Sequence, residues 1–206
     1  MPHPAVRIIA ATALLPWLTL AAAAPSNRPA HEIHLSTDIV FPDKDLVGKD
    51  DEYDPNLRVN FGYSYHFSDY LGLTLEGRIG ALDGSGALGD VDTLGALLGL
   101  DWTLTPRAKW QWVVSGGIDR TQYDPDNGSE FYRTGASLGI GQRYVFENGV
   151  TFNWRVGAET TLTDSGPTDE RFTNGFLRLG FGFPLGYSPA DSDGDGVPDR
   201  RDACPG

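Results

Sequence analysis

The sequence predicts an all-β protein, an eight-stranded antiparallel up-and-down transmembrane barrel with a short irregular calcium-loop tail. Three observations indicate this fold. Apolar and polar residues alternate with period two from residue 33 onward, the connections between these segments are short and long in turn, and glycine (26 residues) and aromatic residues (11%) are abundant. Period-two alternation is typical of a strand that has one apolar face.

The overall composition, taken alone, resembles that of a soluble acidic protein. The 206 residues include 16 Lys+Arg and 28 Asp+Glu, a formal charge of −12. This excess of acid argues against nucleic-acid binding, because phosphate backbones require clusters of basic residues. One cysteine excludes an internal disulfide framework and a Cys-rich zinc site, and the four histidines are scattered. Composition alone therefore does not distinguish a soluble protein from a membrane barrel, and the positions of the charges along the chain have to do so.

Residues 1–23 are expected to be a secretory signal peptide. A basic residue precedes a short apolar run from Ile8 to Leu20, and Ala21 to Ala23 match the small-residue cleavage pattern. The alternative is an uncleaved membrane anchor, but Pro16 interrupts the run, which is shorter than the roughly 20 residues that span a bilayer. Two further domains are expected, the barrel over 24–187 and a linker over 188–206.

Eight segments carry the alternation that predicts strands. The clearest runs from Leu57 to Phe67, where every odd position is apolar or aromatic and every even position is polar or glycine. The eight predicted strands are 33–41, 57–67, 71–81, 94–104, 110–118, 132–146, 150–162 and 175–185.

The predicted connections differ in length in a regular way. The short ones are 68–70, 105–109 and 147–149, and the long ones are 42–56, 83–92, 119–131 and 163–173. An even number of strands with short turns at one end and long loops at the other is the plan of an outer-membrane barrel. Strands of about 9–11 residues cross a bilayer when they are tilted.

Two kinds of barrel compete for this pattern, and they differ in which face points inward. In a soluble, lipocalin-type barrel the apolar face lines the interior, but eight strands enclose too little volume for the many large side chains on that face, four tryptophans among them. In a membrane barrel the apolar face meets lipid. Aromatic residues also gather beside the short turns, where an interfacial girdle belongs. They are Phe67, Tyr70, Trp102, Trp110, Phe146, Phe152 and Phe183.

The polar face carries charged residues that the membrane barrel places in its interior. They are Glu76, Arg78, Asp101, Asp119, Arg133, Arg143, Arg155, Glu159 and Arg178. An unpaired charge in a low-dielectric interior is costly, so these residues are expected to pair with one another. One interpretation is a salt-bridged plug that blocks water, and the other is a polar path for small solutes that can be gated.

The tail after Pro189 has the spacing of a calcium loop. Aspartates stand at positions 1, 3 and 5 of the loop, a spacing that suits a hard cation with oxygen ligands. Gly196 at position 6 permits the sharp turn. The expected Ca²⁺ ligands are Asp191, Asp193, Asp195, Val197 (through its backbone carbonyl), Asp199 and Asp202. A single isolated repeat is expected to bind in the millimolar class. The alternative is an acidic linker that is simply solvated.

A barrel of this plan followed by the tail DSDGDGVPDRRDACPG resembles the OmpA/OprF family of outer-membrane proteins. The tail looks like a thrombospondin type-3 repeat, and residues 178–185 resemble the signal by which the barrel assembly machinery recognises its substrates. The resemblance implies a Gram-negative outer-membrane location, with the N-terminus and the tail in the periplasm and the long loops outside. The partners that it implies are outer-membrane lipid, lipopolysaccharide and the assembly machinery.

The chain departs from this family at its end. It stops at Gly206, where the family would continue into a peptidoglycan-binding domain, and Cys204 lacks the downstream cysteine with which the family's linker cysteine would pair. Peptidoglycan is therefore a partner only through a domain that this chain does not contain.

The expected function is that of a structural barrel supporting envelope integrity, the membrane-anchor part of an OmpA-like protein. The alternatives are a small porin, a surface adhesin that uses the acidic long loops, and a barrel enzyme acting on lipid A. Enzyme activity is not expected, because a nucleophile needs an activating base and the barrel segment has only His31, His34 and His66 and no nucleophile motif.

Overall fold

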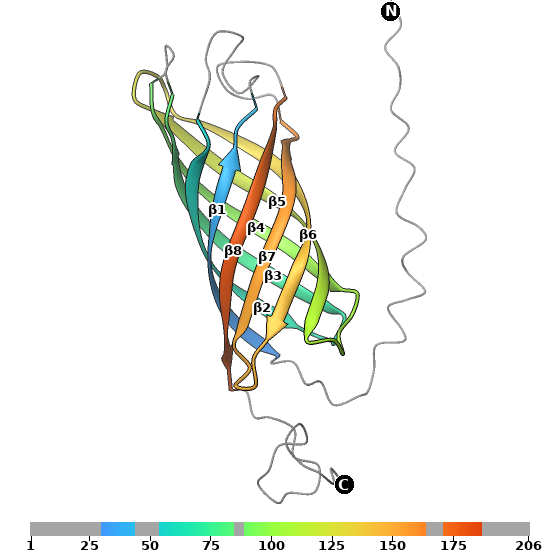
Figure 1. Cartoon of the computed structure of the whole chain (residues 1–206). Helices are drawn as coiled ribbons and strands as arrows, with labels where there is room; N and C mark the ends of the chain where they lie inside the picture. The colour runs from blue at the N-terminus through green and yellow to red at the C-terminus, as the bar shows by residue number, and fades with distance from the viewer. Residues whose placement is uncertain (1–29, 44–53, 85–88, 164–170, 187–206) are drawn as a thin grey trace, which may run out of the picture.

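The computed structural model describes residues 30–43, 54–84, 89–163 and 171–186. They form a closed barrel in which each strand pairs antiparallel with the next, and the last strand pairs with the first (Figure 1). The strands are β1 (His31–Phe41), β2 (Asn56–His66), β3 (Leu71–Leu82), β4 (Val91–Thr103), β5 (Trp110–Pro125), β6 (Phe131–Val145), β7 (Thr151–Thr161) and β8 (Thr173–Leu185). The predicted fold of the barrel is confirmed.

The strand register is staggered around the barrel. Starting from His31 on β1, one passes round all eight strands along directly paired residues and returns to β1 at Phe41, ten positions further on. The paired residues are His31, Tyr65, Leu73, Leu100, Gly116, Leu138, Ala158, Gly175 and Phe41. This stagger requires tilted strands and leaves an interior that side chains alone can fill.

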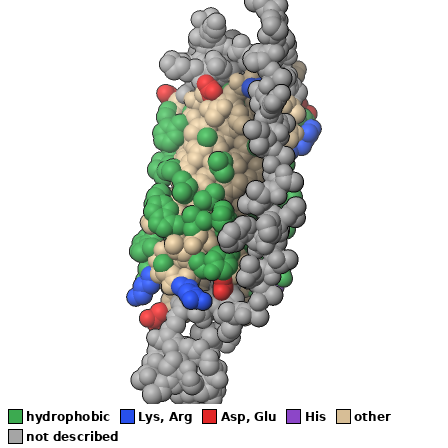
Figure 2. Space-filling view, turned by 90° about the vertical axis from the view of Figure 1, so that its right-hand side faces the viewer, with side chains coloured by type: hydrophobic (Ala, Val, Ile, Leu, Met, Phe, Trp, Pro, Cys, Tyr) green, Lys and Arg blue, Asp and Glu red, His purple; other side chains and the backbone are tan. Residues whose placement is uncertain are grey.

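Alternation along each strand separates an apolar wall from a polar lumen. On β1, His34, Ser36 and Asp38 are buried, whereas Leu35 and Ile39 are exposed. Figure 2 shows hydrophobic side chains over the outer wall, between two rims that carry the charged side chains. The most exposed apolar side chains of this wall include Ile79 (66%) and Leu138 (65%). Such a wall is stable only against an apolar solvent, which a bilayer supplies.

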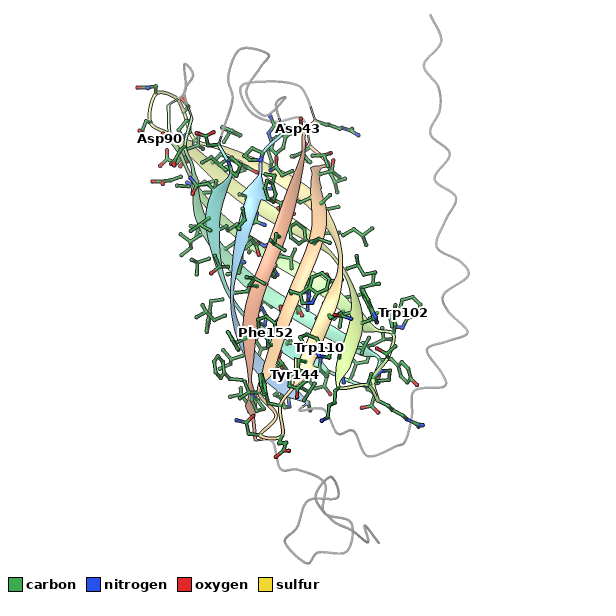
Figure 3. The ribbon with its side chains drawn as sticks, in the orientation of Figure 1. Asp43, Asp90, Trp102, Trp110, Tyr144 and Phe152 are labelled. Atoms are coloured by element: carbon green, nitrogen blue, oxygen red, sulfur yellow. The ribbon has the colours of Figure 1, made fainter. Side chains whose placement is uncertain are left out.

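The two ends of the barrel differ. The short connections 67–70, 104–109 and 146–150 lie at one end, which we call the short-turn end, and the opposite end is the long-loop end. Figure 3 places Asp43 and Asp90 at the long-loop end and Trp110, Tyr144 and Phe152 toward the other. The described residues contain no helix that is long and apolar enough to cross a membrane.

An aromatic belt surrounds part of the wall near the short-turn end. Trp110 packs against Tyr144 with ring centroids 5.1 Å apart, and Phe152 packs against Phe181 at 5.3 Å. Trp110 and Phe152 join the two pairs at 6.4 Å. Aromatic side chains that are partly apolar and partly polar favour the boundary between lipid and water.

One predicted connection is wrong. The segment 119–131 was expected to be a long loop, but β5 continues to Pro125 and β6 begins at Phe131, so only residues 126–130 connect them. The outward residues Arg120 and Asp124 are polar, which ended the apolar alternation that identified the strand. Backbone pairing with β4 and β6 does not need lipid, so the strand continues beyond the apolar band. For the same reason β4 begins at Val91, three residues before the predicted start.

A charge-locked barrel lumen

The centre of the lumen holds a network of six charged side chains, which we call the central cluster. It consists of Asp38, Arg58, Glu76, Arg78, Glu159 and Arg178. Arg178 donates to Asp38 (Nε to Oδ1, 2.6 Å) and to Glu76 (Nη1 to Oε2, 2.8 Å). Since all members are largely buried, these hydrogen bonds are charge-assisted in a low-dielectric surrounding, where such bonds are strong.

The remaining ion pairs of the central cluster lie within one strand, between neighbouring strands or across the lumen. Arg58 of β2 donates to Glu159 of β7 (2.7 Å) and to Asp38 of β1 (2.8 Å). Arg78 of β3 donates to Glu76 on its own strand (2.9 Å) and to Glu159 (3.2 Å). The network thus joins five strands through the inside of the barrel, in addition to the backbone ladder in its wall.

The register explains why these charges meet. Asp38 is paired directly with Arg58 on β2 and with Arg178 on β8, so three charged side chains point into the lumen side by side. Glycine makes room for such side chains on neighbouring strands: a Cβ added at Gly62 would overlap the ring of His34, and one at Gly182 would overlap the carboxylate of Glu32. Glycines at inward positions of one strand therefore leave space for large inward side chains of the next strand.

A second cluster lies nearer the short-turn end. Asp101 of β4 accepts two hydrogen bonds from Arg155 of β7, at 3.0 and 2.9 Å, and one from Arg143 of β6, at 3.1 Å. Arg143 is only 2% exposed. Two guanidiniums thus share one carboxylate in this cluster.

At the long-loop end the lumen contains a cluster of buried apolar side chains, which we call the apolar cap. The cap consists of Leu82, Val91, Tyr123, Phe131 and Phe172. Tyr123 stacks on Phe131 with centroids 5.1 Å apart, and the guanidinium of Arg133 lies 4.9 Å from the ring centroid of Phe172. Phe172 precedes β8 and is held inward because its backbone NH donates to the hydroxyl of Thr161. Phe172 falls in the predicted loop 163–173, although it continues the inward alternation of Asn174 and Phe176 on β8.

The space left between these groups is small. Three cavities of about 20, 30 and 10 Å³ lie in the barrel. A cavity needs roughly 10–15 Å³ to hold one water molecule. Arg78 lines both the first and the second cavity.

The structure places all nine charged residues assigned to the interior by the sequence on the lumen side of the wall. Asp119 accepts a hydrogen bond from the hydroxyl of Thr121 at 3.1 Å. Three inward charges were missed, Glu32, Asp38 and Arg58. Within the described part of the chain the lumen then balances six arginines against six carboxylates. The arginines are 58, 78, 133, 143, 155 and 178, and the acids are Glu32, Asp38, Glu76, Asp101, Asp119 and Glu159.

The structure also brings together a serine, a histidine and an acid that the sequence did not link. His34 Nε2 lies 3.2 Å from Glu76 Oε2, and its Nδ1 lies 3.4 Å from the hydroxyl of Ser64. This order is that of a hydrolytic triad. However, Ser64 is 3% exposed and faces the packed lumen, and Glu76 is bound by two arginines. A substrate therefore has no path to this serine in the described geometry.

The predicted calcium ligands Asp191, Asp193, Asp195, Val197, Asp199 and Asp202 lie outside the described residues. Within the described ranges, no group of three or more His, Cys, Asp or Glu side chains is arranged to hold a metal ion.

An apolar wall around a charged, side-chain-filled lumen defines the class of outer-membrane β-barrels. The family model for the outer membrane protein beta-barrel domain matches residues 10–184. The chain belongs to this family and is an outer-membrane protein.

Solved barrels resemble this one in fold. Neisserial surface protein A aligns with a TM-score of 0.55 and 11% identity, over 76% of this chain and 97% of that one. The outer membrane protein OprG of Pseudomonas aeruginosa aligns with a TM-score of 0.50 and 15% identity, over 78% and 99%. The N-terminal barrel domain of OprF from the same organism aligns at 0.46 and 17%, over 74% and 97%. A comparison with curated proteins finds no match.

Proposed function

We propose that this chain is a structural outer-membrane barrel that supports the cell envelope and does not conduct solutes. The observation that carries the proposal is the paired set of charges that fills the lumen. Asp38, Glu76 and Glu159 each bind two arginines. Three of these pairs cross the lumen: Arg58 and Arg78 bind Glu159 on β7, and Arg178 on β8 binds Glu76 on β3.

The energetics support a closed state. Removing one partner of a buried ion pair costs about 3–5 kcal/mol, because the other charge is left uncompensated. A continuous passage would require several such pairs to separate at once, and the apolar cap to move. The cavities between them have room for single water molecules.

Planar-bilayer recording on the full chain tests the proposal. The expected trace is that of the bare membrane, with a general porin in the same membrane as the positive control. Stable openings of large conductance by the wild-type chain would reject a closed structural barrel.

A small diffusion channel is the second candidate, and one observation favours it. Arg78 lines two of the three cavities, so a movement of its guanidinium away from Glu76 and Glu159 would join them. If the wild type conducts and Arg78→Ala conducts more, the channel is the better assignment. Arg120→Ala, which removes an exposed arginine from the outer face of β5, is the matched control.

The orientation in the membrane and the role of the tail are further proposals. β1 begins and β8 ends at the short-turn end, where His31 pairs with Leu185, so both chain termini leave the barrel on one side. We assign that side to the periplasm, with the tail residues Asp191 to Asp202 as a weak Ca²⁺ linker. Cys204 is the only cysteine. A membrane-impermeant maleimide should therefore label it only after the outer membrane is permeabilised, and labelling of intact cells would reverse the assignment.

Calcium binding by the tail needs its own measurement. Titration calorimetry on the full chain should give heat at millimolar Ca²⁺. The variant Asp193→Asn with Asp195→Asn should lose that heat. No heat from the wild type would remove the metal from the proposal and leave a solvated acidic linker.

A further inference from the structure

In the second cluster two arginines share one carboxylate. Arg143 and Arg155 both bind the same carboxylate, Asp101, and share its Oδ2 at 3.1 and 2.9 Å. In the central cluster, by contrast, three arginines bind three carboxylates. Although the charges of the described lumen are equal in number, the local ratio of arginine to carboxylate is therefore higher here than in the central cluster.

Several donors of this cluster are also unused. The Nε and Nη1 atoms of Arg143 and the Nε atom of Arg155 are buried without a hydrogen-bond partner among the described residues. Arg143 is 2% exposed, and the side chain of Arg155 is 12% exposed. A buried donor without a partner costs about 1–3 kcal/mol, and more when it is charged. Groups in such a position usually bind water or an ion.

A cavity of the lumen adjoins this cluster. It measures about 30 Å³ and is lined by Asp101 and Arg155, by Arg78 and Arg178 of the central cluster, and by the hydroxyl-bearing Ser115 and Ser137. Its charged lining consists of three arginines and one aspartate; Arg78 and Arg178 are paired with carboxylates of the central cluster, and Arg155 brings the unused Nε donor. Its surroundings therefore favour an electron-rich occupant with several acceptor sites.

We propose that the lumen binds a small monovalent anion of the halide class, chloride under physiological conditions, in the cavity beside Arg155. The guanidinium donors in its wall favour an anion over a cation, and a volume of about 30 Å³ favours a small anion over one with bulky groups. The anion accepts from the guanidiniums and from the hydroxyls of Ser115 and Ser137. It balances the charge that Asp101 leaves on the two arginines, so it forms part of the structure that closes the lumen.

Crystallography with bromide distinguishes an anion from water. The full chain, refolded in detergent and crystallised, is soaked in sodium bromide, and data are collected at the bromine absorption edge. An anomalous peak in the cavity between Arg155 and Ser115 is the expected result. Density at that place without anomalous signal means that water fills the cavity, and this outcome overturns the proposal.

Unfolding in solution gives an independent readout that needs no crystals. The urea midpoint of the refolded chain is compared in sodium chloride and in sodium gluconate at equal ionic strength. A ligand that binds only the folded state raises the midpoint with its concentration. We expect a higher midpoint in chloride, and equal midpoints for the wild type would contradict the anion site.

Two variants should change this chloride effect in opposite directions. Arg155→Gln leaves one arginine for one aspartate, so the midpoint should no longer differ between the two salts. Asp101→Asn adds one net positive charge, so the difference should increase. Asp124→Asn, on the exposed outer face of β5, is the control and should keep the wild-type difference. An unchanged difference in Arg155→Gln would overturn the site even if the wild type responds to chloride.

Discussion

Arg178 of β8 and Asp38 of β1 form an ion pair across the seam where the last strand closes on the first, with Nε and Oδ1 2.6 Å apart. The two residues are 140 positions apart in the chain. Because Asp38 also binds Arg58 on the other side, the same carboxylate joins β8, β1 and β2. The seam is therefore closed twice, by its backbone ladder and by a buried ion network inside it.

Asp38→Asn should weaken this seam strongly. Asp38 is fully buried, so its loss as an anion leaves Arg58 and Arg178 with one carboxylate too few, at a cost of about 3–5 kcal/mol. Urea unfolding in lipid vesicles, followed by tryptophan fluorescence, measures the change. The matched control is Asp124→Asn, an exposed aspartate whose replacement should stay within about 0.5 kcal/mol. Equal effects of the two variants would mean that the network contributes nothing to stability.

Phe172→Ala should destabilise the long-loop end. Phe172 is 2% exposed and packs in the apolar cap against Tyr123, at 6.2 Å between centroids. Truncation of a buried Phe costs about 3–5 kcal/mol, whereas Phe172→Leu keeps most of the volume and should cost less than about 1.5 kcal/mol. The same urea titration measures both. A cost for Phe172→Ala no larger than that for Phe172→Leu would indicate that the cap is not tightly packed.

The sequence pattern predicted the strands of the barrel wall more completely than the side chains that fill the lumen. Period two decides on which side of the wall a residue lies, so Glu76 and Arg178 could be assigned to the lumen. The same rule applied to Asp38 and Arg58, which stand at inward positions of predicted strands and were overlooked. Glu32 was missed for a different reason, since it lies one residue before the predicted start of the first strand.

The ion pairs that cross the lumen could not be predicted from the period-two alternation. The contact between Arg58 on β2 and Glu159 on β7 depends on the tilt and stagger of all the strands between them. No local pattern encodes these quantities. Phe172 was missed for another reason: it continues the inward alternation of Asn174 and Phe176, but it lies before the predicted start of the last strand at residue 175.

An arginine introduced on the outer wall should lower the free energy of unfolding, and the loss should be larger near the middle of the bilayer than near its surface. Leu138 lies midway along β6 and is 65% exposed, whereas Leu104 follows β4 at the short-turn end. An arginine at the bilayer midplane of such barrels costs about 2–4 kcal/mol, and one near the interface costs about 0–1 kcal/mol. We expect these values for Leu138→Arg and Leu104→Arg in vesicle-based unfolding. Similar costs for the two variants would contradict the placement of the wall in lipid.

The aromatic belt should contribute to stability through specific ring contacts as well as through its position. Trp110 and Tyr144 lie 5.1 Å apart at 55° between ring planes. Aromatic pairs of this kind contribute about 0.5–1.5 kcal/mol beyond the area that they bury. A double-mutant cycle with Trp110→Ala and Tyr144→Ala in lipid vesicles isolates this coupling, because each single variant also loses its own contact with lipid.

A second cycle provides the control for that coupling. Trp110 and Leu138 both face lipid, but Tyr144 is paired with Trp110 in the register, whereas Leu138 is paired with Gly116 further along β5. Trp110→Ala and Leu138→Ala should therefore be additive within about 0.3–0.5 kcal/mol. Additivity in both cycles would mean that the belt stabilises the barrel only through its preference for the interface, without ring-to-ring contacts.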